Sequence, residues 1–347
     1  MKNIFFVHSQ ITYIVAKKTI AHLKLNVEEC IFLVHRGKSS DYKGFGVQMF
    51  DFPFNPQSTN SFPIYNKFWR NWSNINELDK FINHLTNNTE FYFYTPQTYQ
   101  NYLALIVSHK NCKGFNIIEE GAGSYLAKEK LEEIYPSNLE FTLNERIKWR
   151  LNFFNRLKIN RNFVEKQYLQ AFGLTSYSFG ELQRKVVLGL PTELDFRNDH
   201  QSKGELYTNI LVFDALVEAQ ILDAATLLMT TFIFINWLKK KGATTLYVKY
   251  HPDQIKADKT IKLIKELFIQ IEEIKIQEIP STVSLEEVAL KQDATFFVFG
   301  SSVGLYASFY GRKVISLYKV VERLSPAFSR RVELLPTVFK DKVTFLS

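Results

Sequence analysis

Short apolar runs alternate with segments of helical periodicity along most of the chain. In the first half, runs such as NIFFVHS and GFNIIEEG predict buried strands, and amphipathic stretches lie between them. Apolar strands that alternate with helices are typical of a parallel sheet with helices on both faces. The strands expected in this half are 3–9, 29–37, 90–97 and 114–121, and the helices are 10–23 and 98–110.

A second series of the same kind begins near residue 207. Between the two series, LPTELDFRNDHQSKGE (190–205) is polar and contains a proline, as expected for a linker. We therefore expect an N-terminal α/β domain at 1–190, a linker at 191–205 and a C-terminal α/β domain at 206–347. The strands expected in the second series are 207–213, 244–252, 273–279, 294–300 and 313–318, and the helices are 217–241, 258–271, 284–292 and 303–311.

Composition and charge narrow the class of protein. A chain of 347 residues with 46% hydrophobic and 22% charged residues is globular and long enough for two domains. The net charge of +8 and the pI near 9.1 indicate an anionic partner or surface. Cys30 and Cys112 have neither the spacing of a metal site nor that of a disulfide framework, which favours a reducing compartment.

Two apolar stretches bear on membrane insertion. The N-terminal IFFVH is too short for a signal peptide, so a cytoplasmic location is expected. The run at 221–238, ILDAATLLMTTFIFINWL, is interrupted by Asp223 and Asn236. This pattern favours a buried helix over a membrane span.

Three strand ends carry candidate chemistry, and the first is Glu119-Glu120-Gly121. A carboxylate at a strand end can act as a general base, and glycine lets a substrate approach the backbone. Adjacent side chains at a strand end point in different directions, so one carboxylate would face the site while the other makes a structural bond. A plain charged turn is the alternative interpretation.

The second strand end is VKYHPD. His251 closes an apolar strand and Pro252 fixes the backbone after it. An imidazole at this point could donate a proton to a phosphate oxygen or stabilise its charge. Lys249 lies on the same face of the strand. The alternative is a surface histidine in a turn.

The third strand end is Gly300-Ser301-Ser302, where a helix is expected to begin. Backbone N–H groups, two hydroxyls and the helix dipole together favour an anion site. An ordinary serine N-cap is the alternative. No group of His, Asp or Cys suggests a metal, so we expect protein groups alone to neutralise a departing phosphate.

The three motifs together resemble those of the bacterial sialyltransferases that use CMP-activated sugars. The lipooligosaccharide sialyltransferases and capsule polysialyltransferases share an acidic-acidic-Gly motif, a His-Pro motif and a Ser-Ser motif. Here these are Glu119-Glu120-Gly121, His251-Pro252 and Ser301-Ser302, in the same order. The resemblance covers most of the chain. It implies an α/β fold that is GT-B-like, with two Rossmann-like domains whose parallel sheets face a central cleft.

The resemblance also implies roles for individual residues. Glu119 would deprotonate the acceptor hydroxyl, His251 would assist departure of CMP, and the two serines would hold its phosphate. Glu286 would bind the ribose, with Glu287 as the second choice; a helix cap set by Ser284 is the alternative. The turn VHSQIT is similar to an N-terminal turn of the lipooligosaccharide enzymes and suggests Gln10 on the acceptor side. The expected donor-side residues are Lys249, His251, Pro252, Glu286, Gly300, Ser301 and Ser302, and the expected acceptor-side residues are Gly121 and Gln10, beside Glu119 and Glu120.

The resemblance thus implies an inverting, metal-independent glycosyltransferase that needs no cofactor. Its donor would be CMP-sialic acid or another CMP-nonulosonic acid, and its acceptor a sugar hydroxyl of a bacterial surface glycan, in lipooligosaccharide or capsule. Alternatives are a Kdo transferase or glycerol-phosphate transferase of similar fold, and a non-catalytic nucleotide-binding subunit of a glycan-assembly complex.

The segment 144–166 is basic and amphipathic. Ile147, Leu151, Phe154 and Leu157 recur at helical spacing among lysines and arginines. Such a helix can lie on the anionic inner membrane, and an ordinary domain helix with a solvated basic face is the alternative. A nucleic-acid partner is not expected, because no recognised binding motif accompanies the charge.

Overall fold

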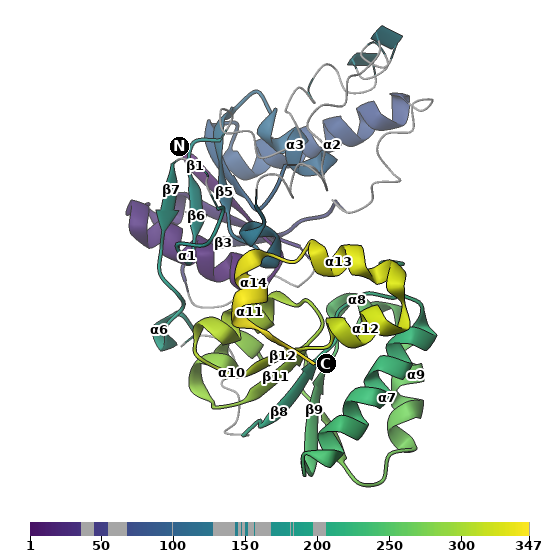
Figure 1. Cartoon of the computed structure of the whole chain (residues 1–347). Helices are drawn as coiled ribbons and strands as arrows, with labels where there is room; N and C mark the ends of the chain where they lie inside the picture. The colour runs from purple at the N-terminus through teal and green to yellow at the C-terminus, as the bar shows by residue number, and fades with distance from the viewer. Residues whose placement is uncertain are drawn as a thin grey trace. The chain divides into compact units, whose positions relative to one another are not determined.

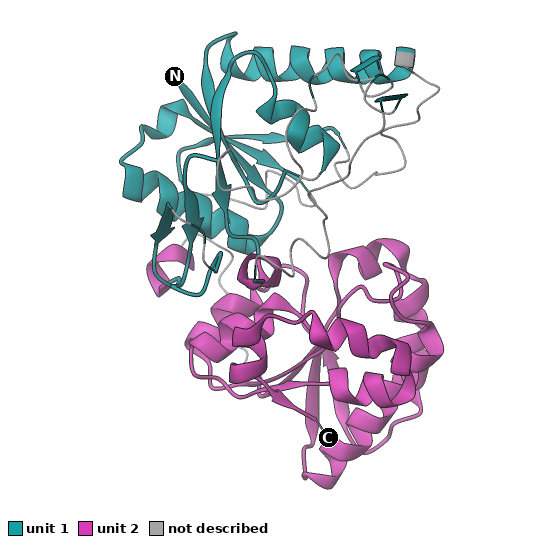
Figure 2. Ribbon diagram, turned by 45° about the horizontal axis from the view of Figure 1, so that its top comes forward, with its two compact units in different colours: residues 1–120, 127–191 teal, residues 121–126, 192–347 magenta. Residues whose placement is uncertain are grey.

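The computed structural model divides into two compact units (Figure 2). Unit 1 comprises residues 1–120 and 127–191, and unit 2 comprises 121–126 and 192–347. The structure describes residues 1–35, 45–54, 68–98, 100–127, 143–144, 147, 150–151, 156, 168–180, 182, 184–196 and 206–346.

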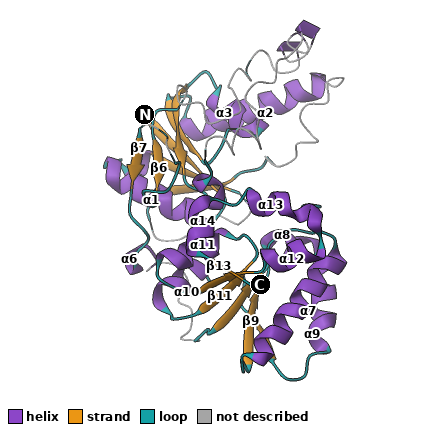
Figure 3. Ribbon diagram, viewed as in Figure 1, coloured by secondary structure: helices purple, strands orange, loops and turns teal. Residues whose placement is uncertain are grey.

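Unit 1 is built on a seven-stranded sheet in the order β3-β2-β1-β4-β5-β6-β7, and all neighbouring strands are parallel (Figures 1 and 3). The strands β1, β2, β4 and β5 are the apolar runs that the sequence predicted, whereas β3, β6 and β7 were not predicted. The strands are β1 (Lys2–Val7), β2 (Cys30–Val34), β3 (Gln48–Asp51), β4 (Phe91–Thr95), β5 (Cys112–Ile118), β6 (Ala171–Gly173) and β7 (Lys185–Val187).

Helices bury both faces of this sheet. Alternate side chains of a strand point to opposite faces, so Phe6 packs in the cluster formed with α2 (Phe68–Thr86) and α3 (Asn101–Val107). Phe5 lies on the other face, where Phe32 meets Tyr13 of α1 (Gln10–Leu23). Helix α1 has the predicted bounds because Ser9 caps it, accepting from the Thr12 N–H at 3.2 Å. A 3₁₀ turn, Val27–Glu29, precedes β2.

Unit 2 contains a six-stranded parallel sheet in the order β10-β9-β8-β11-β12-β13. Its core includes Leu211, Val248 and Phe297 from the strands and Phe234 from α7. The strands are β8 (Asn209–Val212), β9 (Thr245–Lys249), β10 (Lys275–Glu278), β11 (Thr295–Val298), β12 (Val314–Ser316) and β13 (Thr344–Phe345). The helices are α6 (Glu193–Phe196), α7 (Ala224–Lys240), α8 (Pro252–Ala257), α9 (Lys259–Ile269), α10 (Leu285–Lys291), α11 (Ser302–Phe309), α12 (Tyr318–Leu324), α13 (Ser329–Glu333) and α14 (Thr337–Lys342), with a 3₁₀ turn at Pro326–Phe328.

The long helix expected at 217–241 begins later than predicted. Asp223 ends the preceding turns and caps α7, because its carboxylate accepts from the Thr226 N–H at 2.8 Å. Within the described ranges, no helix is long and apolar enough to cross a membrane. The buried side of α7, with Leu227, Phe234 and Leu238, packs in the core of unit 2.

When the strands of each sheet are numbered by their order in the chain, both sheets contain the order 3-2-1-4-5-6. This strand order determines where ligands bind in such sheets. Connections leave in opposite directions from the first strand and its neighbour, which opens a crevice at the carboxyl ends of these two strands. In unit 1 the crevice lies at β1 and β4, and in unit 2 at β8 and β11.

The segment 121–126 belongs to unit 2, although unit 1 precedes and follows it in the chain. It forms a 3₁₀ turn at Ala122–Tyr125, and the buried Tyr125 ring packs against Tyr306 and Phe309 of α11. The sequence pattern placed this segment in the first domain. It also placed the linker at 191–205; residues 192–196 pack in unit 2 through Phe196, and 197–205 lie outside the described residues.

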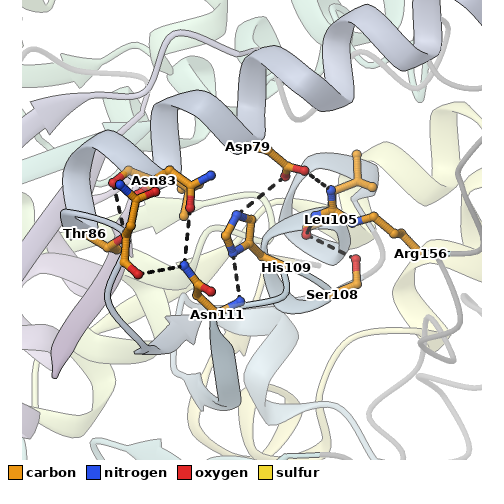
Figure 4. Close-up of polar contacts among 10 residues, drawn as sticks. Asp79, Asn83, Thr86, Leu105, Ser108, His109, Asn111 and Arg156 are labelled. Atoms are coloured by element: carbon orange, nitrogen blue, oxygen red, sulfur yellow. Dashed lines mark hydrogen bonds and ion pairs between the residues drawn. The ribbon is translucent and has the colours of Figure 1, made fainter.

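A buried polar cluster joins α2, α3 and the start of β5 in unit 1 (Figure 4). The Asn111 N–H donates to His109 Nδ1 at 3.2 Å, so neutral His109 carries its proton on Nε2. That nitrogen faces Asp79 Oδ1 at 3.8 Å. Arg156, a residue of the basic segment 144–166, donates to Asp79 Oδ2 at 2.5 Å and to the Leu105 carbonyl at 2.7 Å. Of that segment only Asn144, Ile147, Arg150, Leu151 and Arg156 are described, and its predicted helix otherwise lies outside the described residues.

Burial lowers the pKa of His109 below its usual value of 6.5, against the opposing effect of Asp79, while Arg156 and Lys110 add to the lowering. The unfolded chain therefore takes up this proton first, and stability is lost as the pH falls through 6.5. His109→Asn keeps an acceptor for Asn111 but cannot titrate. We expect its deficit in unfolding free energy, measured by urea denaturation, to shrink by at most about 1.4 kcal/mol per pH unit below 6.5. His84→Asn, at an exposed position of α2, is the control; a pH-independent deficit for His109→Asn would contradict the prediction.

Candidate functional site

Glu119 is buried at the end of β5, and its carboxylate makes structural hydrogen bonds within unit 1. Its side chain is 0% exposed. Oε2 accepts hydrogen bonds from the Leu174 N–H at 2.6 Å and from the Ser178 hydroxyl at 2.7 Å. The carboxylate thus ties β5 to the turn that follows β6. This environment is that of a structural carboxylate, which corrects the expectation that Glu119 faces an acceptor hydroxyl.

Glu120 has the more accessible carboxylate of the pair. Its Oε2 lies 3.4 Å from His8 Nε2, and the two side chains are 25% and 14% exposed. His8 follows β1, at the crevice of the sheet, and its backbone N–H donates to Thr12 Oγ1 at 3.0 Å. Sequence reasoning missed His8, although a histidine directly after the first apolar strand was a signal for it. Gln10, expected on the acceptor side, is the first residue of α1 and is partly buried.

In unit 2, Ser301 and Ser302 stand where the sequence predicted, at the start of α11. Ser301 is the N-cap, and its hydroxyl accepts from the Val303 N–H at 3.4 Å. Ser302 is the first helical residue. The N–H groups of the first turn of a helix have no partner within the helix and favour anions. The end of β11 therefore has the local structure of a phosphate site.

Gly121 packs against this helix start. A Cβ at Gly121 would lie 3.0 Å from both Cβ and Oγ of Ser302, and the backbone φ of +149° also favours glycine. The expected reason for a small residue was access of an acceptor. The structure instead shows that Gly121 is small because Ser302 lies next to it. Glu120 is the residue that directly precedes this glycine.

Asp214 holds the Gly300–Ser302 turn in place, and the sequence analysis did not predict this residue. It follows β8, and its Oδ2 accepts from the Gly300 N–H at 2.8 Å. Burial raises the pKa of Asp214 to about 6. Gly300 is also confined by Tyr318, because a Cβ at this position would lie 2.6 Å from the phenol oxygen. The signal in the sequence was an acidic residue directly after a strand, at LVFD.

His251 begins α8, next to Pro252 at the first helical position. The Asp253 N–H donates to His251 Nδ1 at 3.1 Å. The neutral imidazole therefore carries its proton on Nε2, the tautomer that can donate to a phosphate oxygen. Gln254 is buried and orients the backbone, accepting from the His251 N–H at 3.0 Å. Asp253 Oδ2 lies 3.7 Å from Nδ1 and would stabilise the doubly protonated ring.

Lys249 is occupied by the chain itself. Its ammonium donates to the Pro280 carbonyl and, at 3.1 Å, to the Val283 carbonyl. Burial lowers the pKa of Lys249 to about 8, while Glu286 opposes the lowering. This arrangement corrects the expectation that Lys249 faces the donor, because its hydrogen bonds hold the loop that leads into α10.

The two glutamates of α10 have different surroundings. Burial raises the pKa of Glu286, whose Oε2 accepts from the Ser284 hydroxyl at 3.0 Å. Glu287 is buried and bonded to Lys291 at 2.6 Å, a structural contact within the helix. Ser284 caps α10, because its hydroxyl accepts from the Glu287 N–H at 3.3 Å, and a ribose-binding role for Glu286 stays a prediction.

The residues of unit 2 that carry candidate chemistry share one edge of its sheet. Asp214, His251 and the Gly300–Ser302 turn follow β8, β9 and β11, which are neighbouring parallel strands. Among the residues that the structure describes, no three His, Cys, Asp or Glu side chains are grouped as metal ligands. At this edge an anion would meet backbone N–H groups, two hydroxyls and one imidazole proton.

No family model matches the chain, and no curated protein is similar to it in sequence. Solved structures do match its fold. The Staphylococcus aureus MnaA–UDP structure has a TM-score of 0.55 at 13% identity, covering 99% of this chain and 92% of MnaA. The UDP-GlcNAc 2-epimerase of Neisseria meningitidis, bound to UDP-GlcNAc, has 0.52 at 12%, covering 100% and 95%. That of Methanocaldococcus jannaschii, in complex with UDP-GlcNAc and UDP, has 0.51 at 13%, covering 92% and 84%.

These similarities concern the fold and not the activity, because the identities are low. They agree with the two parallel sheets of this chain. The expected fold class is therefore confirmed: the chain is an α/β protein of the GT-B type with two Rossmann-like domains.

The different surroundings of the two glutamates predict different effects on stability. Glu119→Ala leaves the Leu174 N–H and the Ser178 hydroxyl without their acceptor, at a cost of about 1–3 kcal/mol for each buried donor. Glu120→Ala removes a partly exposed pair with His8, worth about 1 kcal/mol or less. Urea denaturation of both variants would measure the difference. Equal stability of the two would contradict the structural role given to Glu119.

Proposed function

We propose that this chain is a glycosyltransferase-type enzyme that binds a nucleotide-sugar donor at the strand ends of unit 2. The observation that carries the proposal is the start of α11. There the Ser301 and Ser302 hydroxyls and the first N–H groups of a helix meet at the crevice between β8 and β11. The matching structures of MnaA and the 2-epimerases contain UDP or UDP-GlcNAc, which supports a nucleotide sugar for this fold.

The three motifs suggest a role for each group in the proposed reaction. Glu120 accepts the proton of an acceptor hydroxyl as its oxygen attacks the anomeric carbon of the donor. The bond between that carbon and the phosphate oxygen breaks, and the electron pair leaves with the nucleotide. His251 donates from Nε2 to the departing phosphate, while the start of α11 stabilises its charge. Attack opposite to the leaving group inverts the anomeric centre, and the charge is neutralised without a metal.

The finer identity of the donor rests on the three sequence motifs. We infer a CMP-activated nonulosonic acid, with sialic acid as the first member to test, and a sugar hydroxyl of a bacterial surface glycan as the acceptor. Glu286, at the start of α10, is the proposed ribose ligand. A cytoplasmic location would give access to both activated sugar and glycan precursor. UDP-sugars, Kdo donors and CDP-glycerol are the competing ligands that a binding screen should contain, and a non-catalytic nucleotide-binding subunit would bind without turnover.

Glu120→Gln should abolish most turnover and leave donor binding intact. Glutamine keeps the size of the side chain but cannot accept the proton, and general bases contribute about 10²–10⁴-fold to rate. Single-turnover transfer from CMP-sialic acid to a galactoside measures the loss, with other nonulosonates tried if that donor is inert. Glu90→Gln, at an exposed glutamate paired with Lys113, is the matched control. Full activity of Glu120→Gln would overturn the assignment of the base.

The double variant Ser301→Ala, Ser302→Ala should weaken nucleotide binding. Each hydrogen bond to a charged phosphate contributes about 1.5–3 kcal/mol, so calorimetry should show roughly a tenfold loss or more for CMP. Ser308→Ala, near the end of the same helix, is the control, because its hydroxyl only donates to the Leu305 carbonyl at 2.6 Å. Unchanged affinity would mean that the serine pair is a helix cap and no phosphate site.

A further inference from the structure

One part of unit 1, at the start of α2 and within 143–151, exposes large apolar side chains. Trp69, Leu143, Ile147 and Leu151 are between 48% and 74% exposed. The three aliphatic residues are each helical and follow one another at intervals of four, the spacing of side chains on one side of a helix. We call these four residues and Trp72 the Trp69 surface.

The structure joins the two halves of this surface. Trp72 Nε1 donates to the Leu151 carbonyl at 2.9 Å. The Trp69 and Trp72 rings meet edge to face, with centroids 5.0 Å apart. Figures 1 and 2 accordingly show the short helical pieces of 143–151 beside the first turns of α2. Two segments separated by about seventy residues thus present a common apolar face.

Positive charges flank the Trp69 surface. Arg70 and Arg150 are exposed next to its aromatic and aliphatic residues. The stretch 144–166 contains seven basic and two acidic residues, a net of +5 in a chain whose total is +8. Most of the net charge of the protein therefore belongs to the segment that carries Ile147 and Leu151.

Exposed apolar side chains beside positive charge favour one class of partner over the others. A second copy of the chain would bring a like charge to the same face and be repelled. A nucleic acid would match the charge but gain nothing from exposed leucine and isoleucine. An anionic bilayer matches both features, because tryptophan rings prefer the level of the headgroups, aliphatic side chains enter the acyl boundary, and arginines remain with the phosphates.

We propose that the Trp69 surface is the face by which this protein lies on a bilayer with anionic headgroups. The contact is peripheral. It goes beyond the proposed reaction and does not depend on it, because no donor, acceptor or catalytic residue takes part in it.

Co-sedimentation of the whole chain with vesicles tests the proposal. Vesicles of three parts phosphatidylethanolamine to one part phosphatidylglycerol should carry the protein down, and pure phosphatidylcholine vesicles should not. Raising the salt concentration should weaken the binding, since the electrostatic part is screened. Sedimentation with neither vesicle, or equally with both, would overturn the proposal.

Two pairs of variants locate the contact. Trp69→Ser with Leu151→Ser removes apolar contact and should lower vesicle affinity by about tenfold or more. Ile269→Ser with Leu206→Ser, at strongly exposed positions of unit 2, should bind as the wild type does. Arg70→Glu with Arg150→Glu should also bind more weakly, whereas Lys259→Glu with Lys313→Glu, exposed in unit 2, should change binding little.

Thermal unfolding of each variant checks that it is folded, and nucleotide binding in unit 2 gives a second, independent check. The proposal would be refuted if the serine variant and the Arg70→Glu, Arg150→Glu variant both bound the anionic vesicles with wild-type affinity. So would a protein that ignores vesicles but binds RNA or an acidic polypeptide through the same arginines. Neither result would bear on the proposed transfer reaction, which is measured with soluble substrates.

Discussion

In a sheet whose strands are all parallel, every strand ends at the same edge, and this constraint decides where chemistry can occur in each unit. Backbone groups inside the sheet are paired, whereas those at the carboxyl edge turn into loops and helix starts with unpaired N–H groups. In unit 2 this edge brings together Asp214, His251 and the Gly300–Ser302 turn, although they are far apart in the chain. In unit 1 it brings His8 beside Glu120.

Buried charges hold these edges in shape. Glu119 is bonded to the turn after β6, Asp214 to the Gly300 N–H, and Lys249 to the loop before α10. A buried charge is costly unless it is hydrogen-bonded, so each of these groups specifies the conformation of the backbone that satisfies it. None of the three is the group proposed to act on a substrate. Each of them instead fixes a turn that lies next to a group proposed to act on a substrate.

The segment 121–126 shows how closely support and proposed function are connected in this chain. Tyr125 packs its ring on α11, and Gly121 lies against Ser302, the residue proposed to hold phosphate. Glu120, the proposed base, is the next residue toward the N-terminus. The absence of a side chain at Gly121 is therefore explained by packing, while the glutamate pair itself divides into one structural and one accessible carboxylate.

The amino-acid sequence by itself determined the alternation of strands and helices, the two α/β domains and the three strand ends, because these depend on local periodicity and turn residues. It also predicted the bounds of α1, because the capping box of this helix lies within four consecutive residues. It placed the start of α7 seven residues too early, because the cap formed by Asp223 was not recognised. What only the tertiary structure decided was the orientation of each charged side chain. Glu119 and Glu120 are chemically alike and adjacent, so local rules cannot distinguish them. Leu174 and Ser178, more than fifty residues away, bury one of them, and His8, more than a hundred residues away, pairs with the other.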